Sequence, residues 1–265
     1  MPSYSMMKQV SFADAEYAGK RKQTRKASFL IEMDQVVPWK GLIALIEPHY
    51  PKGEGGRPAY PSMAMLRVHL MQNWFGYSDP AMEEALYETT ILRQFSGLSL
   101  KRIPDETTIL NFRRLLEKHD LAAGILGVIN GYLGDRGLSL RQGTIVDATL
   151  IHAPSTTKNK DGKRDPAMHQ TKNQYYFGAK AHIGVDDESG LVHSVVVTAA
   201  NVADVTQVGK LLHGEETVVC ADAGYTGAEK REEHAGREVI WQIAALSNLW
   251  MARRHLLANA GEVRV

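Results

Sequence analysis

The pattern of apolar residues changes after Gly143, and this change is the feature that most constrains the fold of the chain. Upstream, apolar residues recur at helical spacing, whereas downstream they fall in short β-branched runs of strand length. The first run is TIVDATLI at 144–151, and four more follow: YYFGAKAHIGVD at 175–186, LVHSVVVTA at 191–199, TVVCADAG at 217–224 and REVIWQIA at 237–244. A helical region at 1–140 and an α/β region at 141–265 are therefore expected.

Two helices are expected between residues 61 and 95. The segment PSMAMLRVHLMQNWFGY, at 61–77, is apolar almost all round, as is typical of a helix packed between others, and it is expected to end at Gly76. The segment SDPAMEEALYETTILRQF, at 78–95, predicts a second helix. Asp79 is its candidate N-cap, and Pro80 suits the first helical position.

A third helix is expected in PDETTILNFRRLLEKH, at 104–119. Asp105 is its candidate N-cap, and Ile109, Phe112 and Leu116 recur on one face, which we expect to point inward. The outward residues then include the basic side chains Arg113, Arg114 and Lys118. Short helices with tight turns and one basic flank suit a helix-turn-helix-like DNA-binding module, although a plain helical bundle fits these signals equally well.

The charge of the chain is balanced, because its formal net charge is only +1. Residues 1–140 carry 17 Lys and Arg against 15 Asp and Glu, so even the helical region is not strongly basic. Local clusters that suit phosphate contacts are still present, although each cluster alone is more typical of a solvated face. The candidate DNA contacts in the helical region are Lys20, Arg21, Lys22, Arg25, Lys26, Arg113, Arg114 and Lys118.

The sequence predicts a cytoplasmic protein. No uninterrupted apolar run approaches the roughly 20 residues that a membrane span needs, and the first residues lack the hydrophobic core of a signal peptide. The single cysteine, Cys220, has no partner for an internal disulfide and lies in an apolar run, so a buried structural thiol is expected.

The order of elements in the second region predicts how its strands pair. Three strands linked by loops are followed by a helix in ANVADVTQVGKLL, a fourth strand, a short connection and a fifth strand. This order matches a ribonuclease H-like mixed sheet, in which the first and fourth strands are neighbours. Asp147 and Asp222 would then lie side by side. Two such carboxylates can hold divalent cations that activate an attacking oxygen and stabilise the leaving oxygen of a phosphodiester.

Other interpretations exist for both aspartates. Asp222 directly precedes Ala223 and Gly224, and an aspartate at a strand end commonly serves turn chemistry. Asp147 lies within an apolar strand, where an unpaired charge would cost several kcal/mol, so we expect a cation or another partner. A structural salt bridge from Lys180 or His182, which alternate on the second strand, is the alternative to a metal.

Several segments in order resemble the transposase of the bacterial insertion sequence five group, a DDE transposase of the insertion sequence four/five superfamily. The resemblance covers about residues 1–244. It rests on YPSMAMLRVHLMQNWFGYSDPAMEEALYETTILRQFSGL, PDETTILNFRRLLEKH, TIVDATLI, YYFGAKAHIGVDDESGLVHSV and ADAGYTG.

The resemblance implies an N-terminal DNA-binding region followed by a ribonuclease H-like domain that cuts and joins DNA. Motif by motif, Asp147 in TIVDAT is similar to the first catalytic, metal-binding carboxylate and Asp222 in ADAGY to the second, while Tyr225 belongs to the same motif. The implied cofactor is Mg²⁺, for which Mn²⁺ would substitute. The implied partner is double-stranded DNA, both transposon ends and target, and Lys180 is a further candidate phosphate contact. A homo-oligomer is compatible with these features, and a membrane partner is not expected.

The chain departs from the family pattern after residue 244. The family carries its third acid, a glutamate, on a helix in a long basic segment, and no such segment is present here. The sequence passes directly into ALSNLWMARRHLLANAGE, which resembles the family's final helix, so an internal deletion is expected. Its apolar positions Leu246, Leu249, Trp250 and Leu257 would dock on the sheet or form an exposed patch. The glutamates after Asp222 match the missing acid poorly: Glu229, Glu232, Glu233, Glu238 and Glu262.

Three hypotheses follow for function. The first is a DDE-type transposase that cleaves DNA and transfers strands with a divalent metal, with activity weakened by the missing third acid. The second is a non-catalytic remnant that binds DNA or regulates a full-length transposase. The third, a ribonuclease H-like nuclease of another purpose, is disfavoured by the motifs of the helical region.

Overall fold

The computed structural model describes residues 22–52, 58–138, 143–153, 163, 169–170, 177–235 and 239–243. The chain divides into two compact units, Met1–Tyr132 and Leu133–Val265, each with a hydrophobic core of its own. None of the described helices is both long enough and apolar enough to traverse a lipid bilayer.

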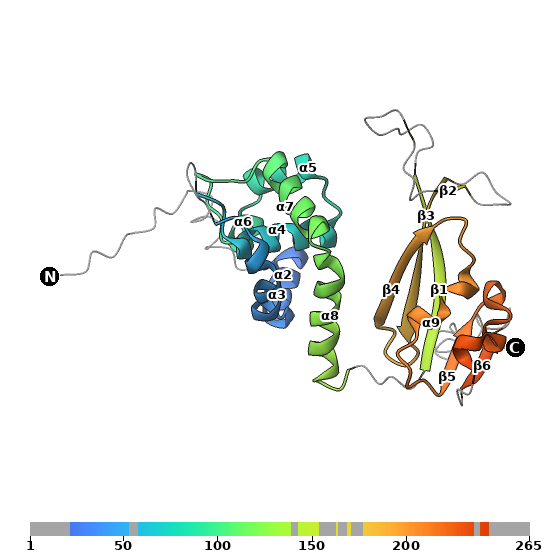
Figure 1. The fold of residues 1–265 in the computed structure, drawn as a ribbon. Helices are drawn as coiled ribbons and strands as arrows, with labels where there is room; N and C mark the ends of the chain where they lie inside the picture. Colours follow the sequence, from blue (N-terminus) through green and yellow to red (C-terminus); the bar gives the residue numbers. More distant parts are fainter. Residues whose placement is uncertain are drawn as a thin grey trace, which may run out of the picture. The chain divides into compact units, whose positions relative to one another are not determined.

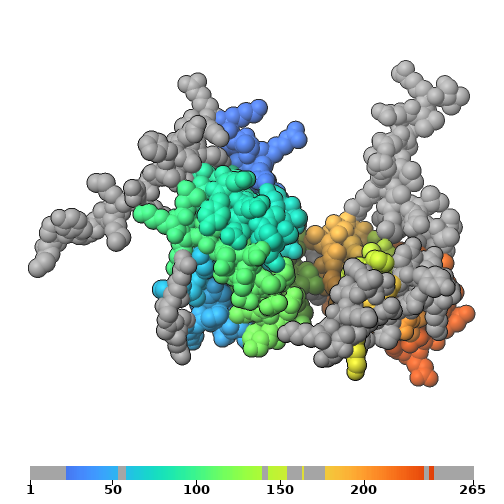
Figure 2. Space-filling model, turned by 90° about the horizontal axis from the view of Figure 1, so that it is seen from above, coloured from blue at the N-terminus to red at the C-terminus, as the bar shows by residue number. Residues whose placement is uncertain are grey.

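The first unit is built of helices (Figure 1). Their bounds are α2 Arg25–Val36, α3 Trp39–Ile46, η1 Glu47–His49, α4 Ser62–Phe75, α5 Asp79–Glu88, α6 Thr90–Ser96, α7 Glu106–Lys118 and α8 Leu121–Gly134. In the space-filling view, the teal and green surface formed by α5 to α7 is continuous (Figure 2).

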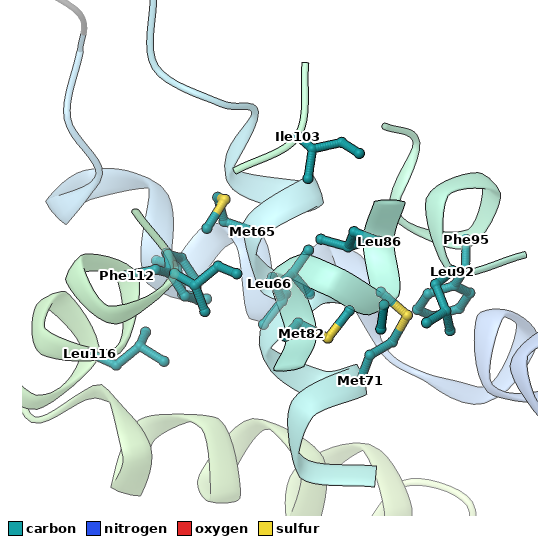
Figure 3. Close-up of a cluster of buried hydrophobic side chains, with 14 of the residues drawn as sticks. Met65, Leu66, Met71, Met82, Leu86, Leu92, Phe95, Ile103, Phe112 and Leu116 are labelled. Carbon is teal, nitrogen blue, oxygen red and sulfur yellow. The ribbon is translucent and has the colours of Figure 1, made fainter. Parts of the chain in front are cut away.

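Helix α4 is the centre of this unit, because it contacts α3, α5, α6 and α7. Its side chains Met65, Leu66 and Met71 are at most 1% exposed and meet Met82 and Leu86 of α5 (Figure 3). Fully burying one such side chain stabilises a fold by about 1.5–3 kcal/mol. The expectation of a helix packed between others is thus confirmed, as is its end at Gly76, which adopts the left-handed conformation that favours glycine.

The start of α5 differs from the expectation. Ser78, not Asp79, is the N-cap, because the Ser78 hydroxyl oxygen accepts a hydrogen bond from the Ala81 N–H. The Asp79 carboxylate points elsewhere and accepts hydrogen bonds from Gln72 and Arg113. The cap prediction for Asp79 was therefore wrong, because tertiary partners claim its side chain.

The expected helix at 78–95 is divided into α5 and α6 at Thr89, whose backbone is extended. The break leaves carbonyl groups at the end of α5 without helical partners. The buried guanidinium of Arg93 donates hydrogen bonds to the carbonyl oxygens of Leu86 and Tyr87 and to the Thr90 hydroxyl. A side chain of α6 thus closes the end of α5.

Helix α7 agrees with the expectation in its cap and in its buried face. The Asp105 carboxylate accepts a 2.8 Å hydrogen bond from the Thr108 N–H, which satisfies an orphan donor of the first turn. Ile109, Phe112 and Leu116 are buried.

The second unit is a mixed sheet with short helices (Figure 1). Its elements are β1 Gly143–His152, β2 His169–Gln170, β3 Phe177–Asp186, β4 Val192–Ala199, η2 Asp204–Thr206, α9 Val208–Leu211, β5 Val218–Ala221, η3 Ala223–Tyr225, η4 Ala228–Lys230, η5 Glu232–His234 and β6 Ile240–Ile243. The sheet order is β2-β3-β1-β5-β6, with β4 paired to β3. The five expected strands are present and the first and fourth are neighbours, whereas β2 lies in a stretch expected to be a loop.

One face of this sheet is covered by the short helices. Val146 of β1 and Val219 and Ala221 of β5 form a core with α9 and η3. Because successive strand residues point to opposite faces, Asp147 faces away from this core. Val195 and Val197 of β4 are 47% and 63% exposed. The strand order is consistent with a ribonuclease H-like fold.

Candidate active site

The register of β1 and β5 brings the two predicted aspartates level with each other. These strands pair in parallel, with Gly143 opposite Val218 and Ile145 opposite Cys220. Continuing that register by two residues sets Asp147 beside Asp222. Cys220 itself is buried, as the sequence predicted.

Asp147 is exposed, so the expectation of a charge buried within an apolar strand was wrong. The reason is the alternation of the strand, which buries Val146 and turns Asp147 to the other face. Its Oδ1 accepts a 2.7 Å hydrogen bond from the Ala148 N–H. The neighbouring strand β5 ends at Ala221, before the level of Asp147 in the sheet. The carboxylate therefore needs no partner for burial and lies open to a ligand.

Asp222 forms the turn that follows β5. Its Oδ1 accepts a 2.9 Å hydrogen bond from the Gly224 N–H and caps η3, so the turn interpretation holds, and the side chain is also exposed. A Cβ placed on Gly224 would lie 3.1 Å from Asp222 Oδ1 and 3.5 Å from Asp204 Oδ2. The missing side chain of Gly224 thus lets two carboxylates approach the same point.

Lys180 pairs with Asp204 rather than with Asp147. Its Nζ lies 2.6 Å from Asp204 Oδ1 and also donates a hydrogen bond to the Val202 carbonyl oxygen. Lys180 lies opposite Leu150 on β1, which points to the opposite face from Asp147. Lys180 therefore does not form the alternative salt bridge with Asp147, because the two side chains lie on opposite faces of the sheet.

His182 does not pair with Asp147 either. Its Nε2 lies 2.8 Å from Thr198 Oγ1, and its Nδ1 lies 3.7 Å from Asp204 Oδ1. Burial lowers the pKa of His182 below its ordinary value and outweighs the opposing effect of the Asp204 charge. The ring is therefore neutral near pH 7.

Tyr225 of η3 carries a buried hydroxyl in the core of the second unit. It is 1% exposed, and its oxygen has no hydrogen-bond partner within the described residues. Burial raises the pKa of Tyr225, and the negative charges of Asp204, Asp147 and Asp222 raise it further. All three carboxylates thus act electrostatically on one buried hydroxyl.

The donor set fits a hard divalent cation in its chemistry. Carboxylate oxygens are the ligands that Mg²⁺ and Mn²⁺ prefer, and both Asp147 and Asp222 offer one from an exposed position. In the part of the chain that the structure describes, no group of three or more His, Cys, Asp and Glu side chains is gathered so as to hold a metal ion. A cation held by these two aspartates would therefore need further ligands.

Of the five glutamates that follow Asp222, two form local ion pairs, one is exposed and two lie outside the described residues. Glu233 accepts from Arg231 at 2.9 Å, and Glu229 lies 4.0 Å from the Lys230 ammonium. Glu232 is exposed on η5. Glu238, Glu262 and the terminal helix expected after residue 244 fall outside the described residues.

Two basic candidates in the helical unit already have partners. Arg113 forms a bidentate ion pair with Asp79, in which its Nη1 and Nη2 donate to Oδ1 and Oδ2 at 3.0 and 2.8 Å. Lys26 donates a 2.8 Å hydrogen bond to the Tyr77 hydroxyl, and its ammonium lies over the Phe75 ring. These contacts compete with any contact to phosphate.

The other basic candidates of this unit are exposed where they are described. Lys22 and Arg25 lie at the start of α2. Arg114 and Lys118 lie one turn apart on α7 and therefore share a face. Lys20 and Arg21 lie outside the described residues.

The structure adds two residues that sequence reasoning did not select, Asp204 and Gly224. Asp204 stood near the start of an expected helix, and no spacing linked it to the strand aspartates. Gly224 was noted only as a turn residue. The sequence did contain a signal for Gly224: it lies two residues after Asp222, and the N–H at that position commonly donates to an aspartate carboxylate in a turn.

Comparison with known families agrees with this geometry. Residues 138–264 match a family model described as a transposase DDE domain, and this match includes Asp147 and Asp222. Residues 18–115 match a family model described as a transposase domain (DUF772), which covers α2 to most of α7. Both matches are thus to transposase domains, one in the helical region and one in the sheet region.

Proposed function

We propose that the chain is a transposase of the insertion sequence five group, which cleaves and joins DNA at the ends of its element. The single observation that carries this proposal is the parallel β1–β5 register, which puts Asp147 level with Asp222 when it is continued two residues past its last pair, Ile145 and Cys220. The match of residues 138–264 to a transposase DDE domain supports it independently. A ribonuclease H-like fold is part of the proposal, because the strand order is consistent with it.

The proposed chemistry uses the exposed carboxylates of Asp147 and Asp222 as ligands of Mg²⁺, or of Mn²⁺ in its place. A divalent cation would supply charge neutralisation for the phosphodiester and activation of the attacking oxygen. The chain itself positions the ligands. The Ala148 N–H orients the Asp147 carboxylate, and the Gly224 N–H orients that of Asp222.

Contacts to double-stranded DNA are proposed mainly for the helical unit. The exposed cations Lys22, Arg25, Arg114 and Lys118 are suited to phosphate contacts, which fix a protein on DNA without reading its sequence. Lys20, Arg21, Lys26 and Arg113 remain candidates of the same kind, as does Lys180 in the sheet unit.

The sequence after β6 favours a second candidate function. The family's third acid has no match there, and we propose that an internal deletion removed it. A DNA-binding remnant that regulates a full-length transposase would keep the helical unit and lose cleavage. The two functions differ in one respect that can be measured, since only the transposase depends on the carboxylate of Asp147.

The experiment is Mn²⁺-dependent nicking of a plasmid that carries the matching element ends, with DNA binding measured on the same samples. The parent chain is compared with Asp147→Ala and with the control Glu215→Gln. Glu215 is exposed and lies before β5, at the opposite end of that strand from Asp222. The transposase proposal predicts nicking by the parent and the control but not by Asp147→Ala, with equal DNA binding by all three proteins.

Two results would overturn the transposase proposal. Nicking that persists in Asp147→Ala would place the chemistry elsewhere or in a contaminant. DNA binding without nicking by the parent would select the regulatory remnant instead.

A further inference from the structure

We propose that α7 is a recognition helix, which lies in the major groove of DNA and reads base edges with Asn111 and Arg114. This inference rests on the proposed function, since it assumes that the helical unit binds double-stranded DNA. It goes further, because phosphate contacts hold a protein on DNA without reading its sequence, whereas contacts to base edges select a sequence. It applies to both candidate functions, since a transposase and a regulatory remnant must each find the same element ends.

The outward face of α7 carries four polar side chains in one row. They recur three or four residues apart, so they share one face of the helix. All four are exposed, and within the described residues none of their side chains forms a hydrogen bond or an ion pair. This outward stripe consists of Thr107, Asn111, Arg114 and Lys118.

The inner face of α7 fixes the direction of the stripe. Phe112 and Leu116 are buried in the core of the helical unit (Figure 3), and their positions on the helix lie roughly opposite the stripe. The Asp105 cap holds the first turn, and the ion pair of Arg113 with Asp79 anchors the middle of the helix to α5. The stripe is thus presented by a capped and anchored helix, which lowers the entropy cost of recognition.

The charges of the stripe suit DNA. Arg114 and Lys118 are positive, and the stripe has no acidic member. The two glutamates within α7, Glu106 and Glu117, lie about a quarter turn or more from the middle of the stripe. The exposed charges of the neighbouring helix α5 are instead acidic: Glu84 and Glu88. Of these two helices, α7 is therefore the one that phosphates attract.

The residue types of the stripe match the hydrogen-bonding pattern of the major groove. An asparagine side chain can pair with N6 and N7 of adenine, and an arginine side chain with O6 and N7 of guanine. A helix about 10–12 Å across fits this groove, which is about 12 Å wide. Thr107 and Asn111 lie in the first half of α7, the half of a recognition helix that usually contacts bases, whereas its last residue, Lys118, suits a phosphate.

A substitution that keeps the charge separates base reading from phosphate contact. Arg114→Lys retains the positive charge but loses the planar pair of donors that guanine accepts. If Arg114 contacts only phosphate, the lysine variant should bind every duplex as the parent does. If Arg114 reads a base, the variant should lose affinity for the element end and keep its affinity for other DNA.

The experiment measures, by fluorescence anisotropy, binding of the full chain to a short duplex copied from the element end and to a scrambled duplex of the same composition. The specificity ratio is the affinity for the first duplex divided by that for the second. We expect Asn111→Ala and Arg114→Lys each to lower this ratio about tenfold, the typical size of one bidentate base contact. Lys118→Ala should weaken binding to both duplexes alike and leave the ratio unchanged. The control Lys40→Ala removes an exposed cation at the start of α3 and should match the parent in both affinities.

Base substitutions in the duplex complete the test. Asn111→Ala should become indifferent to one A·T pair that the parent requires, and Arg114→Lys to one G·C pair. A parent-like ratio in both variants would show that the stripe is only solvated, and equal losses on both duplexes would reduce it to phosphate contacts.

Failure of this inference is distinguishable from failure of the proposed function. Equal binding of the parent to both duplexes would refute base reading and leave nicking that depends on Asp147 untouched. Nicking that persists in Asp147→Ala, with the specificity ratio intact, would instead overturn the proposed function and leave the recognition helix in place. No binding to either duplex would defeat both.

Discussion

Replacement of Arg93 by methionine tests the account of the helical unit at its most specific point. Arg93 is 3% exposed, and its guanidinium donates to the carbonyl oxygens of Leu86 and Tyr87 at 2.8 and 2.7 Å and to the Thr90 hydroxyl at 3.0 Å. Methionine fills much of the same volume but donates no hydrogen bond. The carbonyl groups at the end of α5 would then lose their partners.

The expected loss of stability follows from those contacts. An orphaned buried acceptor costs about 1–3 kcal/mol, and two carbonyl groups are affected, so the free energy of unfolding should fall by about 2–6 kcal/mol. This is a large part of the roughly 5–15 kcal/mol that stabilises a typical domain. The control Arg114→Met, on the exposed side of α7, should change stability by less than about 0.5 kcal/mol.

The assay is urea unfolding followed by tryptophan fluorescence. Trp39 and Trp74 report on this region, because both pack edge-on against Phe95 of α6. A loss of under about 1 kcal/mol for Arg93→Met, with an unchanged urea dependence, would show that water or rearranged backbone satisfies the carbonyl groups. The reasoning that Arg93 closes the end of α5 would then be wrong.

Two further predictions concern Gly224 and Asp79. Gly224→Ala places a methyl group 3.1 Å from Asp222 Oδ1, a few tenths of an ångström closer than ordinary contact. The Mn²⁺ affinity should therefore fall about tenfold with little loss of stability. Parent-like affinity in calorimetry would show that the methyl group does not displace the Asp222 carboxylate. Burial opposes ionisation of Asp79, but hydrogen bonds from Gln72 and Arg113 and the Arg113 charge outweigh it and hold its pKa below the ordinary value. The ionised Asp79 carboxylate therefore stabilises the fold above a pH of about 4, and this stabilisation is lost as the pH falls toward the lowered pKa. In acid unfolding experiments, the difference in stability between the parent and Asp79→Asn should shrink below about pH 4 and stay constant above it.

The strand order could be predicted because each β-branched run has its own length and turn signals. Such runs bury one or both faces, and the order of strands and helices restricts their pairing, so the neighbours β1 and β5 were expected. The exposure of Asp147 could not be read in the same way. TIVDATLI looks buried on both faces, and only the assembled sheet shows that residues on both faces of its second half are exposed.

The features that escaped the sequence depend on side-chain contacts that neither periodicity nor capping rules predict. Arg93 stabilises the break at Thr89 by donating to carbonyl oxygens six and seven residues before it, and the apolar pattern does not predict this contact. Asp79 would be an adequate N-cap by itself, but Gln72 and Arg113 occupy its carboxylate. Asp204 meets Lys180 from 24 residues away and Asp222 through the packing of two short helices, so no motif spacing joins them.

The central claim is that Asp147 and Asp222 act together as one metal-dependent site. Its most direct test is the rate of Mn²⁺-dependent nicking by Asp147→Asn, Asp222→Asn and the double variant, each compared with the parent. One shared site predicts that the double variant loses no more activity than either single variant, because either loss already disables the site. Losses that multiply in the double variant, or parent-like nicking in either single variant, would contradict the account.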